Sequence, residues 1–434
     1  MPKYKIYTLG CKVNYYESTS LSETLERNGV RAAAPGEEAD VCIINTCTVT
    51  SESDRKSRQV IRRAIKENPG AKIIVTGCSV ETSGKTIEKI EGVDLLCGNA
   101  CKNYAAQSAL ALLRGEKVLS LVPPLDRAGY EKMSISSSER TRAYIKIEDG
   151  CDNKCAYCII NRARGPVRSR PFDEIISEAK TLLAKGYKEI ILTGIEVSKY
   201  SCGDYTLADV VLALDALDGL LRIGLSSIDP SYLRPDTVAK LARAKHLTPH
   251  FHISLQAGCD RTLSRMRRPY NTSIAARNLE ALRAAIPGVA FTADVIVGFP
   301  GETDADFEDT LRFMDILRPL HLHVFAYSRR PDTEADAMGS QIDENIKSER
   351  SARLIKKGED WKKVLLDEIC ASSPTLDVLF ERCDQKSKTA LGRIPSYAEI
   401  KVKTPCDVRN MMLPVRVLSN DGEYLYGEIE GNQQ

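Results

Sequence analysis

The chain has 434 residues and nearly balanced charge, with 61 Lys and Arg against 59 Asp and Glu. A net charge of +2 argues against a uniformly basic nucleic-acid-binding surface, and the lack of any 18-residue apolar run predicts no membrane-spanning helix. The N-terminal residues do not resemble a signal peptide. We therefore expect a cytoplasmic protein whose 14 cysteines bind metal or do redox chemistry rather than form disulfides.

The first 115 residues alternate between short apolar runs and helical patterns. Strands are expected at 3–9, 40–45, 72–77 and 93–97, with helices at 15–28, 52–67, 82–91 and 99–114. Such alternation predicts an open α/β sheet. Cys11, Cys47 and Cys78 each lie one or two residues beyond the end of a strand. Because ligands bind at the carboxyl edge of open α/β sheets, we expect these three thiols to converge on one site.

A second set of three cysteines lies in the motif GCDNKCAYC at 150–158, which contains Cys151, Cys155 and Cys158. Structural zinc sites generally use four ligands, and no fourth soft ligand is present in this run. A [4Fe-4S] cluster held by three thiolates keeps one iron open for another ligand. The motif therefore favours an iron–sulfur cluster over the two alternatives, which are a zinc site and a group of buried free cysteines.

Residues 140–370 follow a Pro- and Ser-rich linker at 116–139 and again alternate between strands and helices. Strands are expected at 143–147, 189–194, 222–227, 251–256, 293–298 and 322–327, with helices at 173–185, 206–217, 272–284 and 303–317. Six units are too few for a closed eight-stranded barrel, so a partial (β/α)6 barrel is predicted. Active sites of such barrels lie at the C-terminal ends of the strands.

Polar residues and glycines that stand at or just beyond the ends of these strands, and in one case (Asp294) within the strand at 293–298, are candidates for contact with a cofactor. They are Gly194, Glu196, Ser254, Gln256, Asp294 and Gly298. The paired histidines of two strands (His250 with His252, and His321 with His323) are expected to pack in the core, with at most one of each pair facing the barrel.

The C-terminal part has a long charged helical pattern at 340–368 and then several short strands. The strands predict a small antiparallel β-barrel at 371–434. Runs of arginine elsewhere follow the cysteine motif and the strand at 251–256, which suggests a phosphate-binding rim. The candidate RNA-binding residues are Arg162, Arg164, Arg168, Arg265, Arg267 and Arg268.

Four short stretches, TLGCKVN, INTCTVT, TGC and GCDNKCAYC, occur in this order along the chain. Together they resemble the methylthiotransferases, a branch of the radical S-adenosylmethionine (SAM) superfamily, over essentially the whole chain. The resemblance implies two [4Fe-4S] clusters, held by Cys11, Cys47 and Cys78 and by Cys151, Cys155 and Cys158, with catalytic roles for all six. It also implies that SAM contacts Tyr157 and the strand-end residues named above, and that the C-terminal barrel is similar to the RNA-binding TRAM domain.

Within this branch, TLGCKVN and NTCTVT are most similar to the MtaB type. That type implies conversion of threonylcarbamoyladenosine at position 37, in the anticodon loop of transfer RNA, to its 2-methylthio form, with an electron donor and a sulfur source as further partners. The MiaB type, which acts on isopentenyladenosine, and the RimO type, which acts on a ribosomal-protein aspartate, are the alternatives. Glu196, Ser198 and Pro269 depart from the usual pattern of relatives, which leaves the substrate-reading residues open.

A different class of function also remains open at this point: a non-enzymatic iron–sulfur protein that binds RNA or carries electrons. Reductive cleavage of SAM distinguishes this class from the enzyme.

Overall fold

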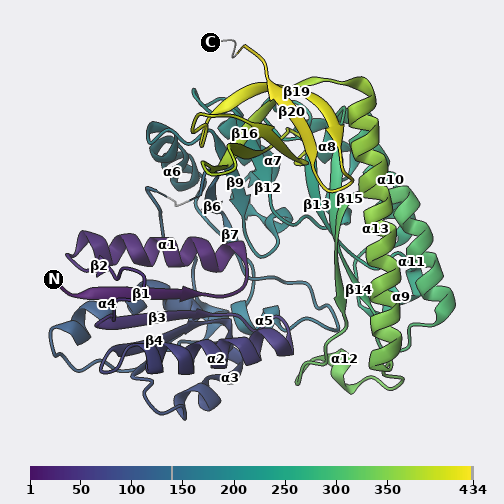
Figure 1. Ribbon diagram of the computed structural model, residues 1–434. Helices are drawn as coiled ribbons and strands as arrows, with labels where there is room; N and C mark the ends of the chain where they lie inside the picture. Colours follow the sequence, from purple (N-terminus) through teal and green to yellow (C-terminus); the bar gives the residue numbers. More distant parts are fainter. Residues whose placement is uncertain (138–139, 432–434) are drawn as a thin grey trace.

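The computed structural model describes residues 1–137 and 140–431, and the chain forms three parts (Figure 1). An N-terminal sheet is followed by a larger strand–helix region, and a small barrel packs above that region. Ser138 and Glu139, at the end of the expected linker, and residues 432–434, at the end of the expected last domain, lie outside the described residues. Within the described residues, no helix is both long and apolar enough to cross a membrane.

The N-terminal part is a parallel five-stranded sheet with the order β2-β1-β3-β4-β5. The strands are β1 (Lys3–Thr8), β2 (Arg31–Ala32), β3 (Val41–Thr46), β4 (Lys72–Gly77) and β5 (Leu95–Cys97). The helices are α1 (Lys12–Arg27), α2 (Ser51–Glu67), α3 (Cys78–Glu88) and α4 (Lys102–Leu113), with the 3-10 turn η1 (Asn99–Cys101) before α4. The central strand β3 is buried at all six positions, as its apolar sequence VCIINT predicts. The expected open α/β sheet is confirmed, and only the two-residue edge strand β2 was not expected.

The segment between the first two parts is packed against them and is not a free tether. Met133 and Ile135 are buried in the main hydrophobic core. The carboxylate of Glu131 accepts hydrogen bonds from the backbone N–H groups of Lys102 and Asn103, at the start of α4. This Pro- and Ser-rich segment, which contains η2 (Leu125–Arg127), therefore helps to fix the N-terminal part in place.

The central part has six strands in two parallel halves, ordered β12-β9-β6 and β13-β14-β15. The strands are β6 (Ala143–Lys146), β9 (Glu189–Thr193), β12 (Arg222–Leu225), β13 (His250–Gln256), β14 (Ala290–Val297) and β15 (Pro319–Ala326). Isolated bridges from Ile223 to Leu247 and from Ile228 to Ile253 connect the halves. This is the partial barrel that the sequence predicts.

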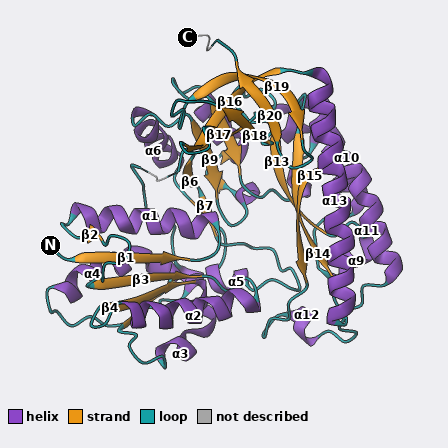
Figure 2. Ribbon diagram, viewed as in Figure 1, coloured by secondary structure: helices purple, strands orange, loops and turns teal. Residues whose placement is uncertain are grey.

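Helices cover the outer face of these strands (Figure 2). The expected ones are α6 (Phe172–Ala184), α7 (Leu207–Asp215), α10 (Thr272–Ala285) and α11 (Asp304–Leu317). Several short elements were not expected: α5 (Ile160–Arg164), α8 (Pro235–Leu241), α9 (Asp260–Arg265), α12 (Glu334–Ala337), η3 (Val197–Lys199), η4 (Pro230–Tyr232) and the two-residue strands β7 (Glu148–Asp149), β8 (Arg168–Ser169), β10 (Ser201–Cys202) and β11 (Tyr205–Thr206).

The long helix α13 (Glu344–Ser372) runs beside β15 and leads into a closed five-stranded barrel. The barrel strands are β16 (Thr375–Asp384), β17 (Thr389–Arg393), β18 (Glu399–Lys403), β19 (Met412–Asn420) and β20 (Leu425–Ile429). All neighbouring pairs are antiparallel, as expected, except for the parallel pair of β18 and β20. The barrel contacts the central strands, because Tyr397 stacks on His250 with ring centroids 4.3 Å apart.

The N-terminal part also contacts the loop that follows β15. Arg330 donates a hydrogen bond to the Thr48 hydroxyl at 2.6 Å and lies 3.6 Å from the Asp54 carboxylate. Beside it, the Ser51 hydroxyl donates to the backbone carbonyl of Arg329 at 2.6 Å. The loop thus connects the far end of the central part to the start of α2.

Candidate active site

The fold brings Cys11, Cys47 and Cys78 to the same carboxyl edge of the N-terminal sheet. Cys11 is the residue that caps α1, Cys47 directly follows β3, and Cys78 is the first residue of α3. The N-termini of two helices therefore point at this edge, and their partial positive charge favours thiolates and an anionic cluster.

Two glycines allow the close approach of these cysteines. Gly10 and Gly77 adopt φ values of +94° and +100°, which L side chains rarely adopt. A Cβ at Gly10 would lie 2.8 Å from both Cβ and Sγ of Cys47, and a Cβ at Gly77 would lie 2.4 Å from the carbonyl oxygen of Thr46. The backbone at this edge therefore has no room for side chains at these two positions.

The three thiols influence one another electrostatically. Burial raises the pKa of Cys47 to about 11, and the charges of Cys78 and Cys11 add to the increase. Desolvation by the surrounding protein also raises the pKa of Cys11, while the charge of Arg164 lowers it and that of Cys78 raises it. Three converging thiols of this kind suit a metal cluster, because a bound metal converts a coordinating thiol into the thiolate.

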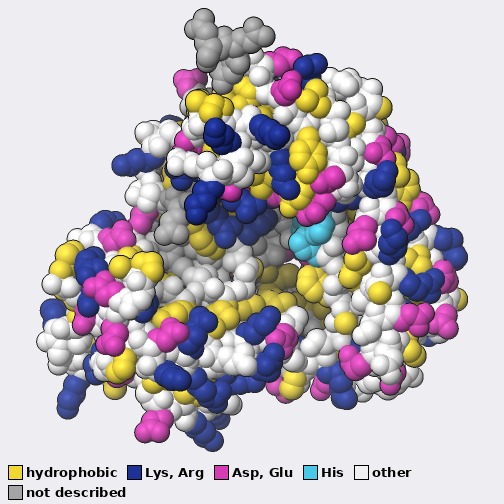
Figure 3. All heavy atoms as spheres, viewed as in Figure 1, with side chains coloured by type: hydrophobic (Ala, Val, Ile, Leu, Met, Phe, Trp, Pro, Cys, Tyr) yellow, Lys and Arg dark blue, Asp and Glu magenta, His cyan; other side chains and the backbone are white. Residues whose placement is uncertain are grey.

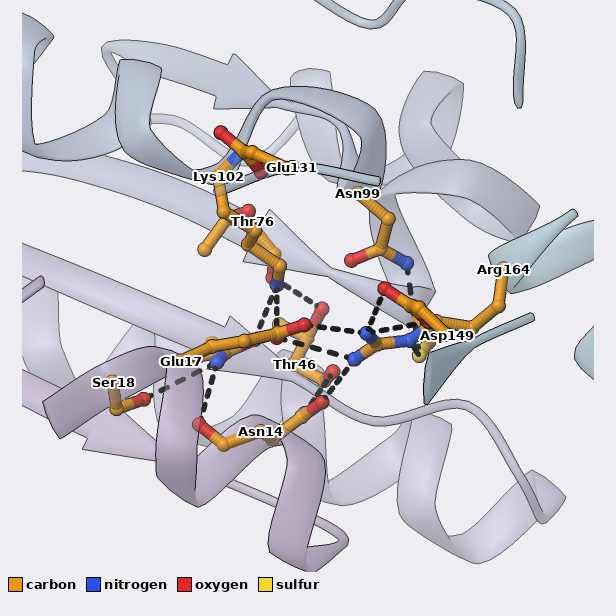
Figure 4. A network of polar contacts seen from close by, with 12 residues as sticks. Asn14, Glu17, Ser18, Thr46, Thr76, Asn99, Lys102, Glu131, Asp149 and Arg164 are labelled. Carbon is orange, nitrogen blue, oxygen red and sulfur yellow. Dashed lines mark hydrogen bonds and ion pairs between the residues drawn. The ribbon is translucent and has the colours of Figure 1, made fainter. Parts of the chain in front are cut away.

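A buried polar network lies directly beside Cys78 (Figure 4). Arg164, from α5, places its Nε 3.4 Å from the Cys78 Sγ, and its side chain also contacts Glu17 and Asp149. Lys102 and Lys146 lie 3.1 Å and 2.8 Å from the carboxylate of Glu17.

The network contains more positive than negative charge. Four buried cations surround the two carboxylates of Glu17 and Asp149, namely Arg164, Arg168, Lys102 and Lys146. Buried charge needs a partner of opposite sign. A cluster held by three thiolates supplies negative charge next to Arg164, so the donor set and its surroundings both fit an iron–sulfur cluster.

The second set of cysteines lies in the loop after β7, at the C-terminal ends of the central strands. The Cys151 N–H donates to the Gly165 carbonyl at 3.0 Å, and the Asn161 side chain donates to the Cys151 carbonyl at 2.8 Å. Burial raises the pKa of Cys151 and of Cys158; the charge of Glu196 and the neighbouring thiols add to the increase at Cys151, and Cys155 adds to it at Cys158. The loop is therefore held by its backbone, and its three thiols remain available as ligands.

A chain of contacts connects this loop to the ends of the other strands. Arg268 donates from Nη1 to the Cys155 Sγ at 3.2 Å and from Nη2 to Asp229 at 2.6 Å. The Asp229 N–H donates to the Glu196 carboxylate at 3.2 Å. Burial and the charge of Asp229 raise the pKa of Glu196 to about 7. Glu196, an expected SAM contact, thus lies within one network with the cysteine loop.

An unsatisfied buried carboxyl oxygen lies near the same strand ends. Glu148 accepts a hydrogen bond from the Glu196 N–H through Oε2, but its Oε1 has no partner among the described residues. A Cβ at Gly194 would lie 2.5 Å from this carboxylate, so only glycine fits above it. Burial raises the pKa of Glu148 well above its ordinary value. An oxygen acceptor without a partner, beside Gly194 and Glu196, fits the amino group of SAM.

The other expected SAM contacts differ in their surroundings. Tyr157 is half-buried with its ring edge-on to Phe299, and Ser254 is buried with its carbonyl accepting from Arg268. Gln256 has a φ of +64° at an irregularity of β13. At Gly298, an added Cβ would lie 2.3 Å from the side chain of Lys347, which indicates a packing requirement at this position.

Asp294 lies beside two histidines. Its carboxylate is 3.2 Å from the His252 Nε2, and ligand atoms of Asp294, His252 and His323 lie within 4.8 Å of one another. The expectation of core packing for the histidines is wrong for His321 and His323, which are exposed. His250 and His252 both contact the Thr292 hydroxyl, because residues two apart on a strand share a face. The expectation that the two members of a pair differ, with at most one facing the barrel, is therefore wrong for this pair.

A cleft separates the N-terminal sheet from these strands. Figure 3 shows the hollow, with Lys and Arg side chains above it and histidine at its edge. Cys11 and Lys12 are exposed, whereas Cys47 and Cys78 are buried. Desolvation by the surrounding protein and the charge of Arg142 lower the pKa of Lys12 to about 8, although Asp294 counteracts this. Lys12 therefore faces the same space as Asp294.

Three of the six arginines expected to bind RNA are buried, which corrects that expectation. Arg164 and Arg168 belong to the network beside Cys78, and Arg268 supports Cys155. Arg265 is half-buried and donates to the Pro300 carbonyl. Only the side chains of Arg162 and Arg267 are largely exposed, at 50% and 55%, and each pairs with an acid.

The sequence interpretation missed four residues of the site: Glu17, Glu148, Asp229 and Lys12. Glu148 directly precedes Asp149 at the end of a strand, and Lys12 directly follows Cys11. Both residues could therefore have been predicted to lie at the site from their positions in the sequence. Glu17 and Asp229 could not have been predicted in this way, because only the tertiary fold brings them to their arginine partners.

Two family models match the chain. Residues 145–314 match the radical SAM superfamily, and residues 3–98 match the family described as Uncharacterized protein family UPF0004. Among solved structures, the radical S-adenosylmethionine methyltransferase TsrM from Kitasatospora setae, with cobalamin and a [4Fe-4S] cluster bound, has a TM-score of 0.58 at 13% identity. That alignment covers 77% of this chain and 73% of that chain, and it supports the α/β radical SAM fold.

Relatives with known names match over nearly the full length. Threonylcarbamoyladenosine tRNA methylthiotransferase MtaB of Bacillus subtilis is 37% identical, covering 99% of this chain and 96% of that protein. The tRNA-2-methylthio-N(6)-dimethylallyladenosine synthase of Endomicrobium trichonymphae is 34% identical, covering 90% and 92%. Radical SAM proteins use SAM and [4Fe-4S] clusters, and methylthiotransferases carry two such clusters. The chain belongs to the radical SAM tRNA methylthiotransferase family, and it is an enzyme.

Proposed function

We propose that the enzyme converts threonylcarbamoyladenosine at position 37 of transfer RNA to its 2-methylthio derivative. The observation that carries the proposal is the exposure of Cys11, whose two partner cysteines are buried. A site formed by the three cysteines is then accessible on the side of Cys11. Several relatives named for this substrate are 32–38% identical to the chain.

The residues divide into two groups with different roles. Cys151, Cys155 and Cys158 hold one cluster, with Glu196 and the unpartnered oxygen of Glu148 directed to SAM. Cys11, Cys47 and Cys78 hold the other, beside the cations around Arg164. When bound, SAM and the two clusters supply the radical and the methylthio sulfur that replaces the hydrogen at C2 of the adenine. The protein keeps the target carbon between the two sets of cysteines and excludes water.

The proposed RNA contacts follow from the geometry of an anticodon loop. A base must leave its stack to enter the cleft, and this costs a few kcal/mol, least for a nucleotide that is already in a loop. The C-terminal barrel, proposed to be a TRAM-like RNA-binding domain, adjoins the cleft through Tyr397 and His250. We also propose that the enzyme acts in the cytoplasm with an electron donor and a sulfur source.

Mass spectrometry of nucleosides tests the substrate. Transfer RNA from a deletion strain should lack the 2-methylthio form of threonylcarbamoyladenosine and retain the unmethylthiolated nucleoside. The purified enzyme should act on RNA with threonylcarbamoyladenosine and not on the same RNA with bare adenosine. Methylthiolation of dimethylallyladenosine or of a ribosomal-protein aspartate instead would contradict the proposed substrate.

Cysteine variants test the two roles. A variant with Cys11, Cys47 and Cys78 changed to alanine should still cleave SAM reductively but form no methylthio product. Cys151→Ala should do neither. Full product formation by the first variant would contradict the sulfur-donor role of the N-terminal site, and absence of SAM cleavage by the wild type would favour a non-enzymatic iron–sulfur protein.

A further inference from the structure

Lys12 is a cation without a partner inside the cleft. It directly follows Cys11, begins α1 and is exposed, and it makes no hydrogen bond or ion pair with any of the described residues. The charges that act on it most strongly are those of Arg142, Asp294, Arg140 and Cys11. Asp294 of β14 acts electrostatically on Lys12, and Lys12 acts on His250 of β13 and His323 of β15, so its ammonium group lies near these three strands.

The opposite wall of this space is polar and carries little charge of its own. Asp294 lies 3.2 Å from the His252 Nε2, and the His252 Nδ1 is 2.8 Å from the Thr292 hydroxyl. His323 is exposed and stands with its ring edge-on to His252. These groups suit hydrogen bonds to hydroxyl, amide and carboxylate groups.

The same wall has the ligand types of a divalent-metal site, but the surrounding charge opposes that use. Two imidazoles and one carboxylate resemble a known iron-binding arrangement. Here two further cations, Arg142 and Arg140, act on Lys12 together with the single carboxylate of Asp294. Arg142 is also paired with Glu381 at 2.9 Å, whereas Lys12 has no such partner among the described residues. Like charges repel strongly in a space enclosed by protein. An anionic ligand therefore fits this part of the cleft better than a divalent metal ion.

The names of the relatives contain two different nucleosides, and the substituents of these nucleosides differ in charge and polarity. A threonylcarbamoyl group carries a carboxylate, a hydroxyl and a urea, whereas a dimethylallyl group is a hydrocarbon. An ammonium group enclosed against a hydrocarbon loses water and gains nothing in return. Against a carboxylate it forms a charge-assisted hydrogen bond.

We propose that Lys12 binds the carboxylate of the threonylcarbamoyl group and so determines substrate specificity, an inference that rests on the proposed function. His323 and His252, on the opposite wall, contact the hydroxyl and urea of the same group. Lys12, which recognises the threonylcarbamoyl group, is adjacent in sequence to the exposed Cys11. Binding of this group therefore also positions the adenine relative to the N-terminal cysteine site.

Three anticodon stem-loops of one sequence test the proposal: one with threonylcarbamoyladenosine, one with its threoninamide analogue, and one with bare adenosine. Wild-type enzyme should prefer the carboxylate over the carboxamide by about 10- to 100-fold in kcat/KM, mainly through KM, the range expected for hydrogen bonds to charged groups. In Lys12→Met this ratio should fall to about one- to threefold. Lys12→Arg should retain most of it.

Lys89→Met is the matched control, because Lys89 is exposed at the end of α3, outside the site. It should retain the wild-type preference. If Lys12→Met binds less iron, the ratio is measured instead from the dissociation constants of the two RNAs, which requires no turnover. His323→Ala should weaken binding of both modified RNAs and preserve the preference for carboxylate.

The outcomes separate the two levels of the proposal. A Lys12→Met variant that keeps the full preference for the carboxylate overturns the role of Lys12 and leaves the proposed substrate intact. A wild-type enzyme that modifies none of the three RNAs overturns both.

Discussion

Arg164 of the central part lies with its Nε 3.4 Å from the Sγ of Cys78 in the N-terminal part. The two residues are 86 positions apart, and the contact is fully buried. The radical SAM domain thus contributes a buried positive charge, Arg164, to the N-terminal cysteine site. The N-terminal part therefore does not contain its complete cysteine site by itself.

Replacing Arg164 should affect both stability and iron content. Arg164→Met leaves Glu17 and Asp149 with fewer cations and removes the positive charge beside Cys78, so we expect a loss of about 3 kcal/mol in the free energy of unfolding. Arg164→Lys should lose less. Anaerobic urea denaturation and iron analysis measure both effects. Wild-type stability and iron content in Arg164→Met would show that the network does not depend on this residue.

Gly77→Ala should disrupt the N-terminal site alone. The added Cβ would meet the Thr46 carbonyl oxygen at 2.4 Å, and the positive φ adds strain. Reconstituted protein should fall from about eight to about four irons per chain, with SAM cleavage retained. Gly29→Ala is the matched control, because Gly29 has a φ of +79° and nothing within 4 Å. It should lose about 1 kcal/mol of stability and keep all its iron.

The exposed and buried arginines should differ in their effect on RNA binding. Changing Arg162 and Arg267 to alanine should make the logarithmic salt dependence of RNA binding shallower by about 1.4, if each neutralises one phosphate of a single strand. Arg268→Met should reduce SAM cleavage and leave the salt dependence as it is, because Arg268 is buried against Cys155. Fluorescence anisotropy at several salt concentrations gives the slopes. Equal slopes in wild type and the double variant would remove these two residues from the RNA interface.

His250 should make the folded state sensitive to acid. Burial lowers the pKa of His250 well below 6.5, and the nearby charges of His252, Lys12, Arg393 and Arg142 act in the same direction. Below about pH 6.5 the unfolded chain therefore binds a proton at His250 that the folded chain does not bind. The free energy of unfolding is consequently highest above pH 6.5 and falls as the pH decreases below this value. One such group contributes about 2 kcal/mol between pH 7 and pH 5.

His250→Gln isolates this contribution, because glutamine can still hydrogen-bond to Thr292 and does not titrate. Free energies of unfolding at pH 7 and pH 5 should differ by about 2 kcal/mol less in the variant than in the wild type. An identical pH dependence of the two proteins would mean that His250 is protonated in the folded state.

The regular elements were predictable from sequence because their patterns are local. The apolar run VCIINT, for example, predicts the buried strand β3 without any knowledge of its neighbours. Short helices such as α9, with six residues, are too brief to show a helical period. The convergence of Cys11, Cys47 and Cys78 at one edge followed from the parallel order of their strands.

The arginines show where local patterns stop being informative. In the sequence, Arg162 and Arg164 look equivalent, yet one is half-exposed and the other has no exposed surface. The difference is set by Glu17, which lies 147 residues from Arg164 in the chain. A run of basic residues therefore cannot be assigned to a surface until the positions of distant acids are known.

The N-terminal part contacts the central part through buried polar groups at several separated places, two of which, around Arg164 and around Arg330, contain ion pairs. Swinging one part away from the other would break buried ion pairs at both, and losing even one partner of such a pair costs several kcal/mol. The spacing between the two sets of cysteines is thus a constant of the folded chain. Turnover then depends on diffusion through the cleft. The products of SAM cleavage and the modified base must leave before the next SAM and the next substrate base can bind.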